Sequence, residues 1–269
     1  MEGQSRQAYF AGEHIAQFSR LADLSGSHCL RAVALKAKGL RFGKEGLLPR
    51  PVTSRRVEGR HALIEKPLAT SLEDCDRMQA AFENQQLVLS VGYHQRFRQS
   101  IMQTGQLLAE GAIGKVRCLQ TSSLFAIPTM RDDEGFGGSW SWWKDPRSVA
   151  HLITGGPHTV DLCRWWLGAE IATIAAHSDT FREENPNENT TMALISFTDG
   201  TACTYWSSSV LPDPGFPDEA FRFRFMGDEG LLDLNPYGKL QLASQGTWET
   251  VYEQQPIGFD LSLIHISEP

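Results

Sequence analysis

Two short apolar runs with a helical pattern between them lie in the first half of the chain. Residues 61–65 and 87–91 are brief and rich in Leu, Ile and Val, which is typical of buried parallel strands. Apolar residues recur at helical spacing over residues 72–82, and a second helical pattern covers residues 101–109. Gly111 fits the end of that second helix. This alternation predicts half of a doubly wound, parallel α/β domain.

Longer strands separated by turn signals dominate the second half. Residues 115–127 form an extended segment. Residues 190–197 and 201–207 flank Asp199-Gly200, which is a strong hairpin signal. Residues 221–226 alternate apolar side chains with arginine. These strands predict a large mixed or antiparallel sheet that has one face exposed to solvent or covered by a partner.

A tryptophan-rich loop and a helical pattern lie between these two regions. The loop covers residues 130–144 and contains Trp140, Trp142 and Trp143. The helical pattern covers residues 149–167, and we expect Gly155-Gly156-Pro157 to interrupt it, with Pro157 in the first turn of its second part.

These patterns divide the chain into four parts. We expect an α/β protein in which a partial Rossmann-type nucleotide-binding domain (residues 59–115) precedes an α/β domain with a large mixed or antiparallel sheet (residues 116–260). Residues 1–58 have no β-α-β alternation, and we interpret them as an aberrant or poorly ordered remnant of the nucleotide-binding region. Residues 261–269, LSLIHISEP, resemble a translated adapter from DNA library preparation, so we interpret them as a non-native tail on a truncated reading frame.

Composition narrows the choice of partners. Of the 269 residues, 41% are hydrophobic and 21% are charged, as is usual for a globular protein with a sizeable core. The 25 basic and 32 acidic residues give a net charge of −7, which argues against nucleic acid or an anionic membrane as a partner. No apolar run reaches the roughly 18 residues of a membrane span. The five cysteines form no C-x-x-C pair, which indicates reduced thiols in a cytoplasmic protein.

Charged residues follow both predicted parallel strands. Glu65 and Lys66 end the first run, and Pro67 stops that strand because it lacks a backbone donor. Arg96 follows the second run. Ligands of open α/β sheets bind outside the carboxyl ends of the strands, so these residues are candidates for a ligand site. EKP alone also fits a surface ion pair before a turn.

Several segments resemble the Gfo/Idh/MocA oxidoreductases, the glucose–fructose oxidoreductase and inositol dehydrogenase family, and they occur in the family's order. RHALIEKPLATSLEDCDRM resembles the strand, EKP motif and helix that close the nucleotide-binding domain, and VGYHQRF resembles the strand and Arg-containing turn after it. AEGAIGKV resembles the crossing into the second domain, and TGGPHTVDLCRWWLG resembles the segment with the family's H-x-x-D pair. The resemblance covers about residues 59–260.

The resemblance implies hydride transfer between NAD or NADP and a hydroxyl-bearing carbon of a sugar, inositol or related polyol. Lys66 matches the EKP lysine, which lies near the nicotinamide, and His158 matches the motif histidine, which can donate or accept a proton. Asp161, one helical turn later, is suited to bind substrate or orient the imidazole. These three are the predicted catalytic residues. The predicted cofactor-binding residues are Glu65, Lys66, Pro67 and Arg96.

Substrate contacts are predicted at five further positions, which are His94, Trp142, Trp143, His151 and Thr154. The tryptophans can stack on sugar faces. Thr154 stands where many family members have an Asp, so we do not expect an Asp–His proton relay, and His151 is the candidate substitute. Structural roles are the alternatives to catalysis. His158 can cap the helix or fill space beside it, and Asp161 can pair with Arg164.

Residues 1–58 lack the family's G-x-G-x-x-G turn and its acidic ribose-binding residue. Without them the cofactor's pyrophosphate loses the backbone donors at a helix N-terminus. We therefore expect this chain to bind NAD or NADP poorly and to show little dehydrogenase activity.

Two other functions fit parts of the sequence. A non-catalytic carbohydrate-binding or oligomerisation module would use the tryptophans for sugars and the open sheet face for a second copy, and we expect a homo-oligomer through that sheet. A metal-dependent enzyme would use His151, His158 and Asp161 as ligands. No second ligand cluster supports it, so we expect no metal.

Overall fold

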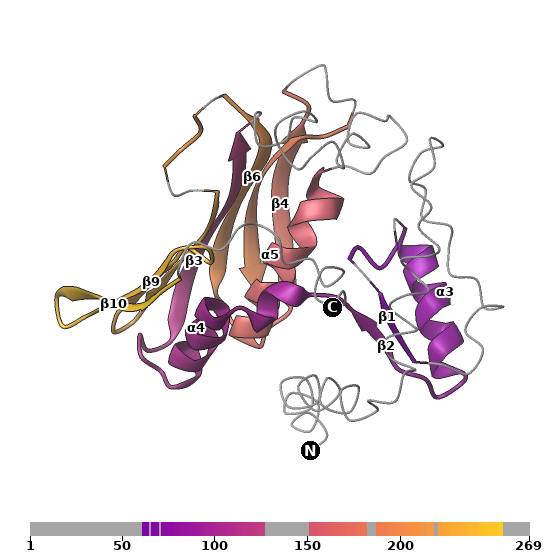
Figure 1. Ribbon diagram of the computed structural model, residues 1–269, viewed down its shortest axis with the longest axis horizontal. Coiled ribbons are helices and arrows are strands. Elements are labelled where there is room, and N and C mark those ends of the chain that lie inside the picture. The colour runs from indigo at the N-terminus through magenta and orange to yellow at the C-terminus, as the bar shows by residue number, and fades with distance from the viewer. Residues whose placement is uncertain are drawn as a thin grey trace, which may run out of the picture. The chain divides into compact units, whose positions relative to one another are not determined.

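The computed structural model describes residues 61–64, 66–69, 71–126, 151–181, 187–212, 214–217 and 220–254. They fall into two compact units, one up to Tyr93 and one from His94 onward (Figure 1). The interpretations of residues 1–58 and 261–269 lie outside the described residues. None of the helices in the described ranges is long and apolar enough to cross a membrane.

The first unit is a β-α-β segment. Strand β1 (Ala62–Ile64) pairs in parallel with β2 (Leu89–Val91), and helix α3 (Leu72–Glu83) connects them. Ser71 caps α3 by accepting a hydrogen bond from the backbone N of Asp74 at 3.2 Å. The predicted strand–helix–strand order is confirmed, and the strands are shorter than the apolar runs.

An eight-stranded mixed sheet forms the frame of the second unit. Its order is β10-β9-β8-β7-β3-β6-β5-β4, and β3 pairs with β6 in parallel while the other pairs are antiparallel. The strands are β3 (Val116–Ala126), β4 (Ile171–Asp179), β5 (Thr190–Phe197), β6 (Ala202–Leu211), β7 (Phe221–Gly227), β8 (Leu231–Leu234), β9 (Lys239–Ser244) and β10 (Thr247–Glu253). The predicted mixed or antiparallel sheet and the Asp199-Gly200 hairpin are therefore confirmed.

Three helical elements accompany the sheet, and they are the 3-10 helix η2 (His94–Phe97), α4 (Gln99–Ala109) and α5 (His151–Leu167). The apolar core lies between these helices and one face of the sheet. Its innermost side chains include Ile101 of α4, Leu162 of α5, and Phe223 and Phe225 of β7. Trp166 packs edge-on against both phenylalanines, at ring-centroid distances of 4.9 and 5.4 Å.

The predicted interruption of α5 at Gly155-Gly156-Pro157 is wrong, because the helix runs through Pro157 without a break. Pro157 removes one helical hydrogen bond. The glycine before it has no Cβ to clash with the proline ring, which relieves the usual restriction on that residue. Burial of Leu162, Cys163 and Trp166 then stabilises the whole helix.

Helix α4 belongs to the second unit, although the sequence pattern groups it with the strands before it. It packs against α5 and against strands β8 and β9. Ile101 and Thr104 of α4 are fully buried there.

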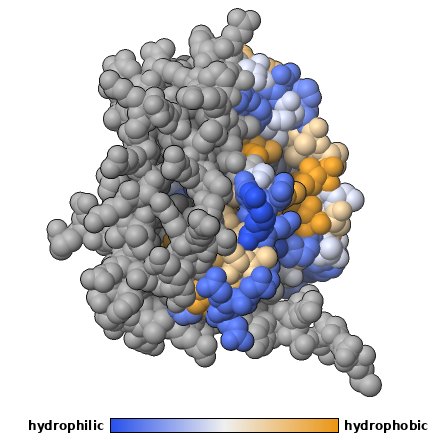
Figure 2. Space-filling view, turned by 90° about the vertical axis from the view of Figure 1, so that its right-hand side faces the viewer, coloured by the Kyte–Doolittle hydropathy of each residue, from blue (hydrophilic) through white to orange (hydrophobic). Residues whose placement is uncertain are grey.

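Figure 2 shows one face of the molecule, where hydrophilic residues predominate among the described residues and smaller apolar patches lie between them.

Candidate active site

Helix α5 carries the predicted His158 and Asp161 one turn apart. Asp161 is only 6% exposed and His158 is half-buried. Residues three apart lie on the same side of a helix, so both side chains face the same surroundings. A carboxylate that is nearly removed from water needs a compensating charge.

Arg96 of η2 supplies that charge. Its Nε donates to Asp161 Oδ2 at 2.7 Å and its Nη2 donates to Oδ1 at 2.5 Å, which is a bidentate pair. The guanidinium also lies 5.5 Å from the centre of the Trp165 ring. The alternative pairing of Asp161 with Arg164 is wrong, because Arg164 forms its own bidentate pair with Glu170.

The same turn of η2 brings His94 to His158. The two ring centroids are 4.8 Å apart and the rings are inclined at 77°, in an edge-to-face contact. Four residues predicted from sequence, His94, Arg96, His158 and Asp161, therefore lie together in the second unit. Arg96, predicted to bind the cofactor, directs the Nε and Nη2 side of its guanidinium at Asp161, and its contact with the cofactor stays a prediction.

Buried polar groups hold η2 in place. Gln95 is 5% exposed, donates to the Tyr237 hydroxyl and accepts from Arg98. Arg98 is 8% exposed, and its guanidinium lies 4.0 Å from the centre of the Tyr237 ring. Ser100 donates to the carbonyl of Pro236. These contacts fix the segment that carries His94 and Arg96 to the turn between β8 and β9.

A row of buried hydroxyls beneath α5 was not predicted from sequence. Tyr205 and Ser207 of β6 and Thr159 of α5 are each less than 5% exposed. Desolvation by burial raises the pKa of Tyr205 to about 12, and the Ser207 hydroxyl partly offsets that effect. A Cβ at Gly156 would lie 3.4 Å from the Tyr205 hydroxyl, which is an ordinary van der Waals contact, and 2.8 Å from Cδ1 of Leu152 on the same helix. The polar residues that alternate along β6 were the sequence signal that could have revealed these hydroxyls.

His151 and Thr154 lie in the first turns of α5. The Thr154 hydroxyl donates to the carbonyl of His151 at 3.0 Å, and the His151 ring lies against Gly155. The carboxylate near this end of the helix belongs to Glu188, which accepts from the backbone N of Leu152. Among the described residues, His151, His158 and Asp161 do not gather as a metal-ligating cluster.

Lys66 lies in the first unit, directly after β1, and a cis peptide bond joins it to Pro67. This is the carboxyl end of a parallel strand, as predicted. Its approach to His158 stays a prediction. The predicted residues Glu65, Trp142 and Trp143 lie outside the described residues.

Comparison with known protein families matches both units in order. The N-terminal family domain, described as an oxidoreductase family with an NAD-binding Rossmann fold, matches residues 52–93. The GFO/IDH/MocA C-terminal domain matches residues 101–233. The chain belongs to the Gfo/Idh/MocA oxidoreductase family. The resemblance inferred from the EKP and H-x-x-D segments is confirmed.

Curated relatives of this Gfo/Idh/MocA chain include inositol dehydrogenases. Inositol 2-dehydrogenase 2 of Saccharopolyspora erythraea is 34% identical over 191 residues, which are 70% of this chain and 51% of that protein. Myo-inositol 2-dehydrogenase of Thermotoga maritima is 23% identical over 145 residues, which are 52% of this chain and 40% of that protein. The Gfo/Idh/MocA chain thus spans about half the length of these relatives or less.

Solved structures share the fold. An inositol dehydrogenase homolog from Azotobacter vinelandii, complexed with NADH and myo-inositol, aligns with a TM-score of 0.61 at 20% identity, over 77% of this chain and 53% of that one. An oxidoreductase from Agrobacterium radiobacter, in complex with NAD+, L-tartaric acid and magnesium, aligns with a TM-score of 0.63 at 22% identity, over 74% of this chain and 56% of that one.

Proposed function

We propose that this chain is part of an NAD(P)-dependent dehydrogenase that oxidises a hydroxyl-bearing carbon of a sugar, inositol or related polyol. The observation that carries the proposal is the cluster of His158, Asp161 and Arg96 on α5 and η2. The relatives, which include an inositol 2-dehydrogenase and a levoglucosan dehydrogenase, support this substrate class.

His158 accepts the hydroxyl proton during oxidation and returns it during reduction. An imidazole suits this role because its ordinary pKa, about 6.5, lies near the working pH. Asp161 orients the substrate or the imidazole, and Arg96 holds its carboxylate in a fixed bidentate geometry. Arg96 compensates the charge of Asp161. His158 is therefore the side chain of the His158–Asp161 pair that exchanges a proton.

NAD or NADP fits the first unit in part. Lys66 and Pro67 follow β1 at the end of the parallel pair where cofactors of such sheets bind. When bound, the cofactor would supply the hydride acceptor. Lys66 would hold its nicotinamide end, and the ammonium charge of Lys66 would stabilise a developing alkoxide.

We expect this chain to bind NAD and NADP weakly, because no G-x-G-x-x-G turn occurs in residues 1–58. Titration of the purified chain with NADH and NADPH, followed by nicotinamide fluorescence, tests this expectation. Weak or no saturation below about 1 mM agrees with it, since the KM values of complete enzymes generally fall between about 1 μM and 1 mM. Saturation at micromolar concentration would mean that residues 1–58 supply a cofactor site.

The exposed apolar residues on the face of the sheet opposite α5 support the prediction of a homo-oligomer. The non-catalytic alternative, an oligomerisation module, would use the same face. Met192 and Leu194 on this face are each more than half exposed, and so are Phe216 and Trp248. Two shallow hollows of about 580 and 670 Å³ lie here, and neither is lined by His94, Arg96, His158 or Asp161. An exposed apolar face of this extent is typical of a protein–protein contact.

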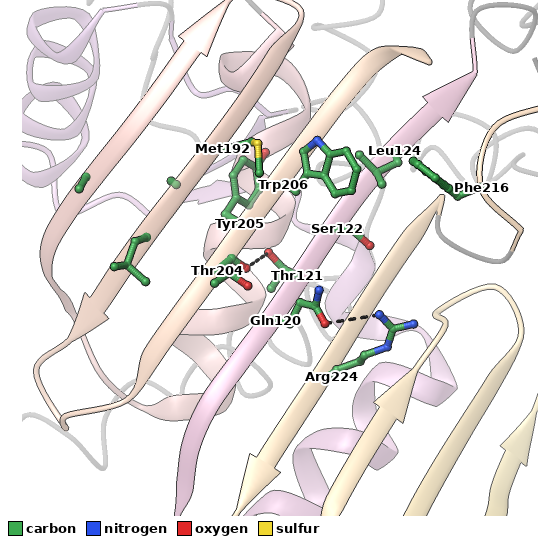
Figure 3. A pocket seen from close by; sticks show the side chains of 13 residues that line it. Gln120, Thr121, Ser122, Leu124, Met192, Thr204, Tyr205, Trp206, Phe216 and Arg224 are labelled. Atoms are coloured by element: carbon green, nitrogen blue, oxygen red, sulfur yellow. Dashed lines mark hydrogen bonds between the residues drawn. The ribbon is translucent and has the colours of Figure 1, made fainter. Parts of the chain in front are cut away.

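Polar groups cross the same face (Figure 3). Arg224 of β7 donates to Gln120 of β3 at 3.4 Å, and Trp206 of β6 lies beside Phe216 at a ring-centroid distance of 5.6 Å. We infer that a second copy covers this face. Light scattering should give a dimer or larger oligomer, and Leu194→Glu should dissociate it because a buried, unpaired carboxylate is costly. A wild-type monomer at micromolar concentration would contradict the inference.

The cysteines of the described residues, Cys75, Cys118, Cys163 and Cys203, are all reduced. Unpaired thiols persist in reducing compartments. We therefore place the protein in the cytoplasm, and expect four accessible thiols in this set after denaturation without reductant.

A further inference from the structure

His94 makes a contact with His158 that the proposed proton transfer does not itself require. Their ring centroids are 4.8 Å apart in an edge-to-face arrangement. Two imidazoles at this distance do not both take up a proton at low cost, because like charges repel. Which ring stays neutral therefore decides which one serves as the proton-exchanging group.

A buried hydrogen-bond chain fixes the proton position on His94. Arg98 Nε donates to Gln95 Oε1 at 2.8 Å. A guanidinium N–H only donates, so the atom of Gln95 that faces it is the amide oxygen and the other is the NH₂ group. That NH₂ group donates one hydrogen to Tyr237 Oη at 2.9 Å and the other to His94 Nε2 at 3.3 Å. His94 Nε2 is thus an acceptor, and its ring proton is on Nδ1.

The surroundings keep this arrangement from reversing. Protonation of His94 at Nε2 would direct an N–H at the NH₂ group of Gln95. Rotating the Gln95 amide by half a turn would instead direct that NH₂ group at Arg98. Gln95 and Arg98 are 5% and 8% exposed, so water does not readily compensate for either mismatch.

We propose that His94 is a positioning residue for His158, held in its neutral Nδ1–H form so that His158 alone carries the proton of the pair. The proposal rests on the proposed function for the use made of that proton, but its test needs no catalysis. A neutral ring tolerates an imidazolium beside it and can attract it through its π face, whereas a charged ring repels it.

Other titratable groups surround the pair and are the same in every variant below. Those on the elements packed around it are Arg96, Arg98, His151, Asp161, Cys163, Glu188, Cys203, Tyr205 and Tyr237. The Arg96–Asp161 pair is neutral as a whole. The hydrogen bond with the Cys203 thiol and then burial raise the pKa of Cys163, so the Cys163 thiol stays uncharged.

The protonation states can be read directly by NMR. The full chain, labelled with 15N-histidine, is titrated while long-range proton–nitrogen spectra record each ring nitrogen. His94→Phe and His158→Asn assign the two resonances. We expect a His94 pattern of protonated Nδ1 and unprotonated Nε2 throughout the range in which His158 titrates. A His94 with protonated Nε2 in that range would overturn the proposal.

Two variants test the coupling to His158. His94→Phe keeps a neutral ring, so the His158 midpoint should move by less than about 0.3 pH unit. If His94 carries the proton in the wild type, the same variant raises that midpoint by about one unit instead, which contradicts the proposal. Because this comparison needs no charged substitution, it decides the matter even where other variants do not fold.

Gln95→Glu reverses the hydrogen bond to His94. The new carboxylate accepts a hydrogen bond and draws a proton onto Nε2, so His94 becomes a cation. We expect the His158 midpoint to fall by about half a unit to one unit, since the carboxylate on the far side offsets part of the repulsion. Gln106→Glu on the exposed side of α4 is the matched control, and His177, with 75% of its side chain exposed, is an internal reference. Gln106→Glu should leave the His158 midpoint unchanged, and the His177 midpoint should be the same in every variant. An unchanged His158 midpoint in folded Gln95→Glu would refute the proposal.

Discussion

Replacing Arg96 with Met should destabilise the second unit through Asp161. The Met side chain keeps much of the Arg volume but removes both donors to the carboxylate. Asp161 is then left as an uncompensated charge with 7% of its side chain exposed. Breaking a buried ion pair from one side costs about 3–5 kcal/mol. Arg96 itself is 21% exposed, so water reaches its end of the pair, and we expect a loss of about 2–4 kcal/mol.

Urea unfolding followed by circular dichroism measures this loss. Asp161→Asn should cost about 1–2 kcal/mol, since it leaves the more exposed partner unpaired. The double variant should cost less than the sum of the two, with a coupling energy of about 1–3 kcal/mol. Arg164→Met is the matched control, because its bidentate pair with Glu170 is 46% and 67% exposed and should contribute less than about 1 kcal/mol. If Arg96→Met costs no more than Arg164→Met, the argument from burial is wrong.

Three further predictions follow from single positions. Gly227→Ala should cost about 3 kcal/mol or more in urea unfolding, because its Cβ would overlap the Ile113 carbonyl oxygen. Gly105→Ala should cost less than about 1 kcal/mol, because the nearest contacts of its Cβ would be 3.4 Å away. Burial raises the pKa of Tyr205 to about 12 from 10.0, so the stability it contributes is complete below pH 10 and is lost as pH rises towards 12. Tyr205→Phe should remove that part of the alkaline loss in unfolding measurements between pH 9 and 12. In a complete enzyme, Lys66→Ala should lower kcat at least about 100-fold with little change in cofactor affinity; equal losses would make Lys66 a cofactor anchor instead.

Local patterns predicted most of the strands and helix ends. The alternation in β7, the Asp199-Gly200 turn and Gly111 after α4 each report a constraint within a few residues. The same reasoning failed at Pro157, where burial of the helix face outweighs one missing hydrogen bond. It also grouped α4 with the preceding strands, because an apolar helix face does not identify the sheet that it covers.

Part of the candidate site could likewise be predicted from local motifs, and part of it could not. The EKP and H-x-x-D motifs singled out Lys66, His158 and Asp161 through the family resemblance, and their catalytic roles stay predictions. The Arg96–Asp161 pair joins positions 65 residues apart, and no local signal distinguishes it from the pairing with Arg164. The hydrogen bond from Gln95 to Tyr237 spans 142 residues and depends on how η2 meets the turn after β8.

The most direct test of the account joins residues 59–260 to a glycine-rich nucleotide-binding half from a relative. Reduction of NAD or NADP is then followed by absorbance with myo-inositol and a panel of sugars and polyols. We expect turnover with at least one of them, and His158→Asn should lower kcat about 100-fold or more while leaving cofactor binding intact. Turnover that is unchanged in His158→Asn would contradict the assignment of His158 as the group that exchanges the substrate proton.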